Sequence, residues 1–468
     1  MWKIIKNEGK SLIRSKVLLG LSIIFFLILL CSVLLGKLQS DKQMQRSNLA
    51  KKQLRNQWEN IEGMNAHGAA HYGTYIFKPS NFLNGLDEGV NSVTGNVLRV
   101  EGHVQNEIVY AEASQMQAVS KFGKLKSALL LQYVLPLLLI FLAFHSISSE
   151  KQSGRLKLLM LQGTEPSALV WGKTVSVWLY GMALLTLTLI FYALFNLNNI
   201  DTEIINRTLF FYLSYTLYYF ILIGLTVLFA ARANANLALT SMLGIWIIWT
   251  VFLPNILMSS VTNWHQLPSR NQFKEAMKEE RSQGIDGHNP YDERVLELEN
   301  QVLAEYGVDS LSQLPINFDG LRMQADEEFG NQVWNKHFGG LRSILSQQKT
   351  SYQLAGILNP FISLQNASMG FAASDNFHHQ EFLVQVEHYR RTLIKALNDE
   401  HAFGGSKTGD WDWEPDKDFY KSVPDFKYQN TALDNILKNH LPDIMVLIGW
   451  TILIGLLLVF ATKKMPIL

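Results

Sequence analysis

Cysteine is nearly absent from this chain of 468 residues, and the single one, Cys31, lies inside an apolar run. No disulfide can form within the chain, so its polar parts must be held together by packing and hydrogen bonds. The sequence also contains no Walker A motif, G-x-x-x-x-G-K-[ST], and no G-x-S-x-G or H-E-x-x-H motif. We therefore expect that the chain does not hydrolyse nucleotides itself and is not an enzyme.

Charged residues are also missing from six long apolar runs, which carry no Asp, Glu, Lys or Arg near their middle. A helix of about 20 apolar residues crosses a hydrocarbon core of about 30 Å. Gln132 is the polar exception within the runs. Transporters coupled to protons or sodium usually need ionisable groups in the membrane, so transport here would take its energy from elsewhere. The runs predict an all-α polytopic membrane protein with six transmembrane helices, at residues 17–36, 128–144, 170–195, 209–231, 237–257 and 442–462.

The N-terminal region predicts an uncleaved membrane anchor with a short helix before it. A signal peptide is the alternative, but the first apolar run is longer than a typical signal core and no small-x-small cleavage site follows it. Residues 1–16 place apolar side chains on one helical face and basic ones on another, which suits a helix lying in the membrane interface. The apolar ones are Trp2, Ile5, Leu12 and Ile13. The simpler alternative is a basic flank.

Lys and Arg near the ends of the runs predict the orientation in the membrane. Residues 1–16 carry five of them and the loop at 145–169 carries three, whereas the opposite short loop at 196–208 carries only Arg207. Short loops rich in Lys and Arg stay in the cytoplasm. We therefore predict cytoplasmic N- and C-termini and two extracytoplasmic inserts, at residues 37–127 and 258–441.

Both inserts are expected to be mainly helical. Residues 37–65 contain no glycine before Gly63 and extend the first transmembrane helix outward, whereas 71–102 are rich in Gly and Asn and are predicted to be irregular or partly extended. Further helices are expected at Arg270–Gln283, Pro290–Tyr306, Phe318–Ala355 and Phe377–Asn398.

The inserts predict no metal site and no catalytic group. His378, His379, Glu381 and His388 share one expected helix, which we interpret as an exposed polar face. The acidic stretch at 410–418 carries proline where a calcium loop needs glycine, so an acidic turn is the preferred interpretation. His67 and His71 have no nucleophile near them in the sequence. No cofactor is therefore expected in this chain.

The loop at 145–169 contains the segment 148–163, SSEKQSGRLKLLMLQG, between two transmembrane runs. Leu156, Leu159 and Met160 are spaced i, i+3, i+4 and would form one apolar stripe on a helix. The segment resembles the coupling motif of ABC type-2 permeases, roughly E-x-x-x-G-[TS]-L-x-L-L-L. Glu150, Gly154 and Leu156 match that motif, whereas Arg155 stands where the family has a small hydroxyl residue and Met160 replaces a leucine.

The inserts resemble one branch of the same family, the gliding-motility and copper-enzyme-maturation permeases. The stretches that carry this resemblance are His71–Tyr75 with Lys78-Pro79, Leu314–Gly320 and Glu387–Arg391. The resemblance implies a dimer, with a second copy or a sibling permease, in the inner membrane of a bacterium. It also implies two separate ATPase subunits that carry ATP and Mg²⁺, and a cytoplasmic coupling helix that docks on them.

In that arrangement Glu150 and Arg155 would pair with charges on the ATPase, and Leu156 and Leu159 would fill its groove. Closure of the ATPase pair would then rock the transmembrane helices between two states, and a solute would be exported. Two alternatives stay open. The chain could transmit force to an extracytoplasmic partner protein without solute transport, or it could be a membrane receptor or scaffold without ATP coupling. No nucleic-acid partner is expected, although the net charge of +1 does not by itself decide this and only the distribution of charge is informative.

Overall fold

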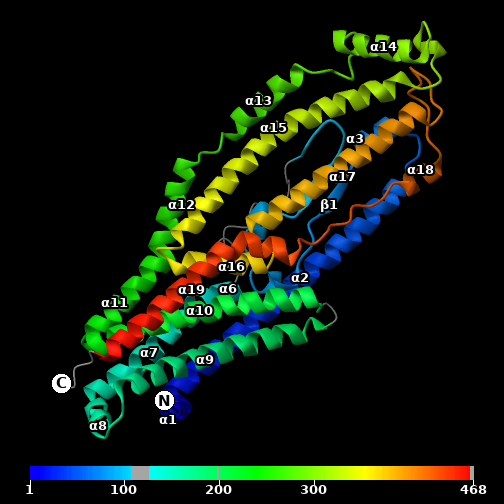
Figure 1. Cartoon of the computed structure of the whole chain (residues 1–468). Coiled ribbons are helices and arrows are strands. Elements are labelled where there is room, and N and C mark those ends of the chain that lie inside the picture. The colour runs from blue at the N-terminus through cyan, green and yellow to red at the C-terminus, as the bar shows by residue number, and fades with distance from the viewer. Residues whose placement is uncertain (107–125, 198–199, 464–468) are drawn as a thin grey trace.

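The computed structural model describes residues 1–106, 126–197 and 200–463; the side chains of Leu12 and Ile13 lie outside this description, so the apolar face expected there is described only at Trp2 and Ile5. The molecule is elongated (Figure 1). Within the described residues it is almost entirely helical, apart from one two-stranded sheet. The N-terminus, the short helix α8 (Arg155–Leu161) and the last turn of α19 (Leu433–Lys463) lie at one end of it, which we call the α8 end.

Six helices in the described ranges are long and apolar enough to cross a membrane. They confirm the prediction of an all-α polytopic membrane protein. The second and the fifth each contain one π-helical turn, η3 (Leu130–Val134) and η5 (Ile248–Phe252). In chain order the six are α2 (Lys16–Glu59), α6–η3–α7 (Ser127–Leu129 and Leu135–Gln152 around η3), α9 (Pro166–Leu194), α10 (Thr202–Arg232), α11–η5–α12 (Ala235–Ile247 and Leu253–Trp264 around η5) and α19.

Helix α10 is the centre of the membrane bundle. About 72% of its most apolar stretch is buried inside the protein, against 22% for α2 and for α11–η5–α12. It packs against α7, α9, α11 and α19, and Phe211, Tyr215, Tyr218 and Tyr219 are completely buried along it. The outer helices instead leave large apolar side chains exposed, such as Ile24 and Leu27 on α2, as expected for helices facing lipid or another membrane protein.

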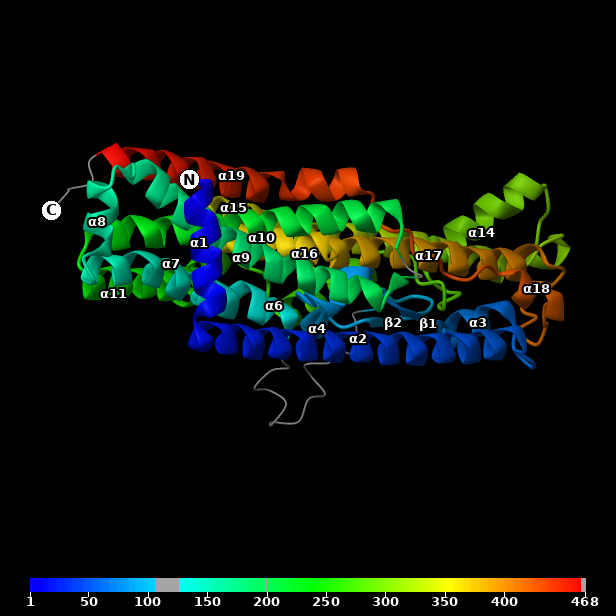
Figure 2. The ribbon, with the colours of Figure 1, turned by 90° about the horizontal axis from the view of Figure 1, so that it is seen from below.

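Helix α2 crosses the membrane and continues far beyond it as a single element of 44 residues. At 1.5 Å per residue its length is about 66 Å, roughly twice the hydrocarbon thickness. The predicted continuation of the first span as one helix through residues 37–59 is therefore confirmed. Figure 2 shows α2 running along one side of the molecule, with α1 (Trp2–Arg14) lying across the spans. Gly36 allows the close approach of α2 to the Gly85 carbonyl, where a Cβ atom would come within 2.4 Å of the oxygen.

The parts of both inserts that extend beyond the bundle, away from α8, form what we call the distal domain. Its strands β1 (Thr74–Phe77) and β2 (Val97–Val100) pair antiparallel, with Thr74 opposite Val100, which confirms that 71–102 is partly extended. The remaining elements of the two inserts are α3 (Ala66–Tyr72), η1 (Phe82–Gly85), α4 (Asn91–Thr94), α13 (Arg270–Ser282), α14 (Glu293–Tyr306), η6 (Leu311–Gln313), α15 (Phe318–Ala355), α16 (Pro360–Phe371), α17 (Asn376–Phe403) and α18 (Lys417–Ser422), of which η1 and α16 pack on the bundle.

Helix α16 was not predicted from the sequence. The four helices expected in the second insert are present as α13, α14, α15 and α17, but α16 follows the expected break at Asn359-Pro360. Proline suits the first turn of a helix because its missing N–H would be unpaired there anyway. The helix packs between α10 and α19, and Phe361, Leu364 and Phe371 belong to the same apolar core as the spans. The second insert is therefore anchored in the bundle.

Asn359 fixes this anchor with two hydrogen bonds. It is completely buried, its Oδ1 accepts from the N–H of Phe361 at the start of α16, and its Nδ2 donates to the Trp249 carbonyl (2.8 Å). Trp249 lies in the π turn η5, where the usual i to i−4 bonding is interrupted. The side chain thus caps one helix and satisfies a buried carbonyl of another.

We expect Asn359→Ala to lower the free energy of unfolding by about 2–3 kcal/mol, because it removes a helix cap and leaves a buried carbonyl unpaired. The matched control is Ser269→Ala, which removes only the exposed cap of α13 and should cost about 1 kcal/mol. Unfolding of the detergent-solubilised protein can be followed by tryptophan fluorescence. Equal losses for the two variants would contradict the role assigned to Asn359.

Candidate functional site

The predicted coupling segment forms a sharp junction between two helices. Helix α7 ends at Gln152, and α8 begins at Arg155 and is seven residues long. Gly154 lies between them with φ of +73°, in the left-handed region that costs glycine little and other residues more. The glycine of the motif therefore produces the turn that separates α8 from the span.

Glu150 lies in the last turn of α7 and faces inward. Its Oε2 atom is 3.0 Å from the Nζ atom of Lys173 on α9, whose side chain is only 1% exposed. The same ammonium group contacts Glu8 of α1 and donates a hydrogen bond to the Ser146 carbonyl (2.7 Å). One buried cation therefore joins α1, α7 and α9 directly behind the junction. Gly172, next to it, lets Ile4 of α1 pack closely on α9.

Lys151 attaches the same turn of α7 to the central helix. Its Nζ atom donates to the carbonyls of Ala233 (2.9 Å) and Ala231 (3.3 Å), at the C-terminal end of α10. A cation at this position satisfies carbonyls that have no partner within the helix and interacts favourably with the helix dipole. The last turn of α7 is therefore held by α1, α9 and α10, so a displacement of α8 would act on all of them.

Helix α8 presents a different apolar face to solvent from the one expected. Leu156 is 8% exposed and packs on the protein, and Leu159 and Met160 are half-buried. Leu158 (58% exposed) and Leu161 (68% exposed) point outward, on the same side as the exposed Arg155. The apolar stripe predicted from the sequence, Leu156, Leu159 and Met160, therefore packs α8 against the rest of this chain.

A buried polar cluster joins the spans to the distal domain. Gln132, in the π turn η3, donates from Nε2 to the Tyr215 hydroxyl (3.0 Å) and to Asp87 Oδ2 (3.2 Å). The Ser368 hydroxyl of α16 also contacts the Asp87 carboxylate and lies 2.9 Å from the Tyr215 hydroxyl. These residues come from the first insert, the second span, α10 and α16. Burial raises the pKa of Asp87, while the hydrogen bond from Ser368 opposes that shift.

A second buried cluster corrects the interpretation of the α17 histidines. His378 and His379 are buried and do not form an exposed polar face, although His388 is exposed. His378 Nδ1 lies 2.5 Å from Asp375, whose other oxygen is 3.0 Å from His440 on α19. Burial alone would raise the pKa of Asp375, but the hydrogen bonds from both histidines hold it well below its usual range.

Four histidines meet in the distal domain, although the sequence separates them widely. His67 and His71 are one turn apart on α3, His103 follows β2, and His288 lies in the loop between α13 and α14. One ring nitrogen from each lies within 4.8 Å of those of the other three. The cluster was not predicted from the sequence, where its only signal is the i, i+4 spacing of His67 and His71, which places both on one helical face.

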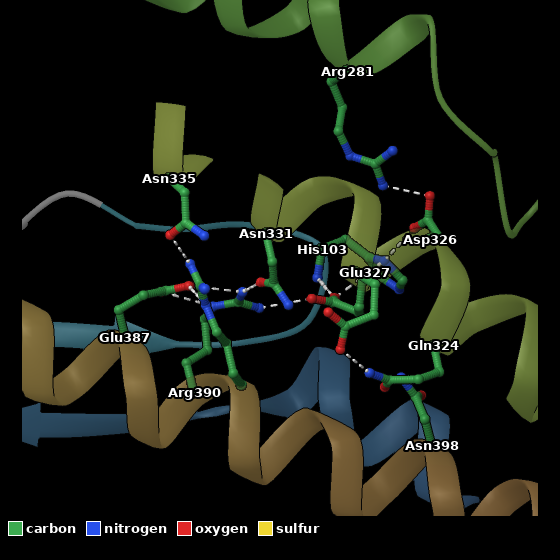
Figure 3. A network of polar contacts seen from close by, with 12 residues as sticks. His103, Arg281, Gln324, Asp326, Glu327, Asn331, Asn335, Glu387, Arg390 and Asn398 are labelled. Carbon is green, nitrogen blue, oxygen red and sulfur yellow. Dashed lines mark hydrogen bonds and ion pairs between the residues drawn. The ribbon is translucent and has the colours of Figure 1, made fainter. Parts of the chain in front are cut away.

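Acidic side chains of α15 hold one of these histidines in position. Figure 3 shows His103 beside Asp326 and Glu327. Asp326 Oδ2 lies 2.8 Å from His103 Nδ1, and Glu327 accepts a hydrogen bond from the His103 backbone N–H. Glu327 also forms a buried ion pair with Arg390 of α17 (2.9 Å). The histidine cluster is therefore connected to the main helices of the distal domain.

The structure defines a multi-pass membrane protein with a large helical distal domain. Two family models match parts of the chain: a domain of unknown function, DUF3526, over residues 270–429, and a protein of unknown function, DUF2705, over residues 99–289. Each match covers less than half of the 468 residues. No curated protein and no solved structure matches the chain.

We expect Lys173→Ala to destabilise the protein by about 3–5 kcal/mol, because it leaves Glu8 and Glu150 without their buried cation. The control is Lys395→Ala, which breaks an exposed pair with Asp399 and should cost about 1 kcal/mol or less. Thermal unfolding in detergent compares the two variants. A shift in Tm for Lys173→Ala no larger than that of the control would show that this cation is not needed to hold α1, α7 and α9 together.

Proposed function

We propose that this protein is the permease subunit of an ATP-binding-cassette exporter in a bacterial inner membrane, with cytoplasmic termini and α8 as its coupling helix. It works as a dimer, with a second copy or a sibling permease. ATP and Mg²⁺ are held by separate ATPase subunits that dock at the α8 end. The observation that carries this proposal is the construction of the α7–α8 junction, because its sequence resembles the permease motif and its contacts hold three other helices.

The outer face of α8 suits a docking role. Leu158 and Leu161 expose apolar side chains on a short helix at the end of the molecule, with Arg155 beside them. Such a patch favours burial against a partner, and each leucine can contribute about 1.5–3 kcal/mol when fully buried. We assign the groove-filling role to Leu158 and Leu161 in place of Leu156 and Leu159. In this assignment Arg155 pairs with an acidic group of the ATPase, while Glu150 acts through Lys173.

Movement of α8 would reach the rest of the protein through the helices that contact α7. Glu150 and Lys151 tie α7 to α1, α9 and α10. Gln132 at the other end of the second span contacts α10 and the first insert. ATP-driven closure of the ATPase pair would bias these helices between two arrangements, because it favours one position of α8 over the other.

Transmission of force without solute transport is the second candidate function, and α2 favours it. This helix runs unbroken from α1 into the distal domain. At its far end Trp58 Nε1 donates to the Tyr420 carbonyl (3.1 Å), and Arg55 donates to the carbonyls of Lys421 (2.8 Å) and Val423 (2.7 Å). A helix held at both ends can carry motion from the membrane to a partner of the distal domain.

The docking assignment predicts that Leu158→Asp together with Leu161→Asp abolishes co-purification with the cognate ATPase, because two charges would enter an apolar contact. The matched control is Leu296→Asp together with Tyr306→Asp, two similarly exposed apolar positions on α14, which should leave co-purification unchanged. Retained binding by the α8 variant would move the docking site elsewhere. Pull-down from membranes that contain both subunits measures the outcome.

The orientation predicts that cysteines at Gln152 and Gln347 are labelled from opposite sides of the membrane by an impermeant reagent. Both positions are exposed, on α7 and α15 respectively. The experiment uses a background in which Cys31 is replaced by serine. Labelling of both positions from the same side would contradict the orientation.

The assignment of ATP to a partner predicts no ATP hydrolysis by the purified chain alone. Phosphate release can be measured with and without the ATPase subunit. Hydrolysis by the chain alone would contradict the assignment.

A further inference from the structure

The four histidines of the distal domain come from three separate parts of the chain, yet their rings face one another. The six distances between ring centroids range from 4.6 Å, for His103 and His288, to 5.7 Å, for His71 and His288. Six nearly equal distances among four points describe a tetrahedron. The rings are therefore arranged around a common centre. Histidines gathered by chance on a surface need not have this arrangement.

The dimensions of this tetrahedron suit a metal ion. With a zinc–nitrogen bond of about 2.0–2.1 Å, four tetrahedral imidazoles have ring centres about 5.2 Å apart and bound nitrogens about 3.3 Å apart. The centroid distances lie on both sides of the first value. The Nε2 atoms of His67 and His71 are 3.1 Å apart, close to the second value. Small movements of the four side chains would bring one ring nitrogen of each within bonding distance of a single ion.

The orientation of His103 points to a ligand at the centre. Its Nδ1 is bound to the Asp326 carboxylate, whereas its Nε2 is buried without a hydrogen-bond partner. Histidines that ligate metals commonly bind a carboxylate through the other ring nitrogen, which fixes the ring and increases its basicity. The backbone of His103 is also in the left-handed region, with φ of +59°, a conformation that non-glycine residues hold only under constraint from their surroundings.

The loop that carries His288 is held close to α15. At Gly287 a Cβ atom would come within 2.9 Å of Asp326 and 3.0 Å of the Arg322 carbonyl, so only glycine allows this approach without a shift. Asp286 accepts a hydrogen bond from the backbone N–H of His288 (3.0 Å). The backbone therefore brings His288 to the other three rings before any ion is bound.

The protonation of the rings also suits metal binding. Burial, together with the neighbouring His103, His71 and His288, lowers the pKa of His67 to about 3. Burial and neighbouring histidines also lower the pKa values of His71 and His288. These lowered pKa values favour the neutral imidazole, which is the form that ligates a metal. Asp326 and Glu327 lie against His103, and each is also paired with an arginine, Arg281 and Arg390 respectively.

We propose that His67, His71, His103 and His288 bind one zinc ion, and that the ion fastens the first insert to the loop between α13 and α14. Four imidazoles in a tetrahedral arrangement suit zinc, whereas copper(II) and nickel(II) favour square-planar or tetragonal sites. Four protein ligands leave no open position for a reacting water, so the site is structural. The proposal is independent of the docking role assigned to α8.

The test uses the full-length protein in lipid nanodiscs, treated with chelator and then given ZnCl₂. We expect one zinc per chain after desalting, measured by elemental analysis. His71→Asn together with His288→Asn changes two exposed ligands and should reduce zinc affinity more than tenfold, while His388→Asn, at an exposed histidine on α17, should leave it unchanged. Asp326→Asn, which keeps all four ligands, should reduce affinity about 10–100-fold.

Two further measurements make the proposal falsifiable without relying on the variants. Cobalt(II) bound to the wild-type protein should give the intense visible absorption of tetrahedral coordination. If the ion fastens the α13–α14 loop, zinc should also slow trypsin cleavage after Arg294, beside that loop. Absence of stoichiometric zinc, equal binding by the His71/His288 variant, or octahedral cobalt spectra would overturn the site. Zinc binding with unchanged cleavage would overturn the fastening role.

Discussion

The buried ammonium group of Lys173 is the interaction on which the α8 end of this protein depends. An isolated charge in this position would be costly, and the group is tolerated because two carboxylates and a backbone carbonyl surround it. Glu8 and Glu150 belong to elements far apart in the sequence, so the requirement to compensate one cation fixes the relative positions of α1, α7 and α9. The segment that we propose to couple to an ATPase is thus part of the membrane bundle, and its glutamate has a partner within the chain.

The same constraint, that polar groups buried in an apolar surrounding must find partners, explains how the bundle joins the distal domain. The two π turns interrupt the regular bonding of the second and fifth spans. Tyr219 donates to the Leu131 carbonyl in one of them (2.9 Å), and Asn359 donates to the Trp249 carbonyl in the other. The second of these partners comes from the insert. Satisfying the backbone of a span therefore also determines where the insert attaches.

The parts of the fold that depend on local pattern could be predicted from the sequence. The six spans follow from hydropathy, the extension of α2 follows from a long polar stretch without glycine or proline, and α13, α15 and α17 follow from their periodicity and breaks. Helix α16 was missed because its 12 residues are short and lie in an insert expected to be outside the bundle. The buried state of His378 was missed because its partners, Asp375 and His440, meet only when α17 packs on α19.

The candidate sites show more clearly that local sequence pattern does not predict contacts between distant segments. The spacing of Leu156, Leu159 and Met160 correctly indicated an apolar face on α8, but spacing cannot tell whether such a face covers the chain's own bundle or a partner. The histidine cluster depends on contacts between residues 67 and 288, which no local pattern contains. A tetrahedral set of this kind needs α3, the turn after β2 and the α13–α14 loop to be in place together. The close approach at Gly287 and the hydrogen bond from His103 Nδ1 to Asp326 bring these segments together, so the geometry of the cluster follows from the packing of both inserts around α15.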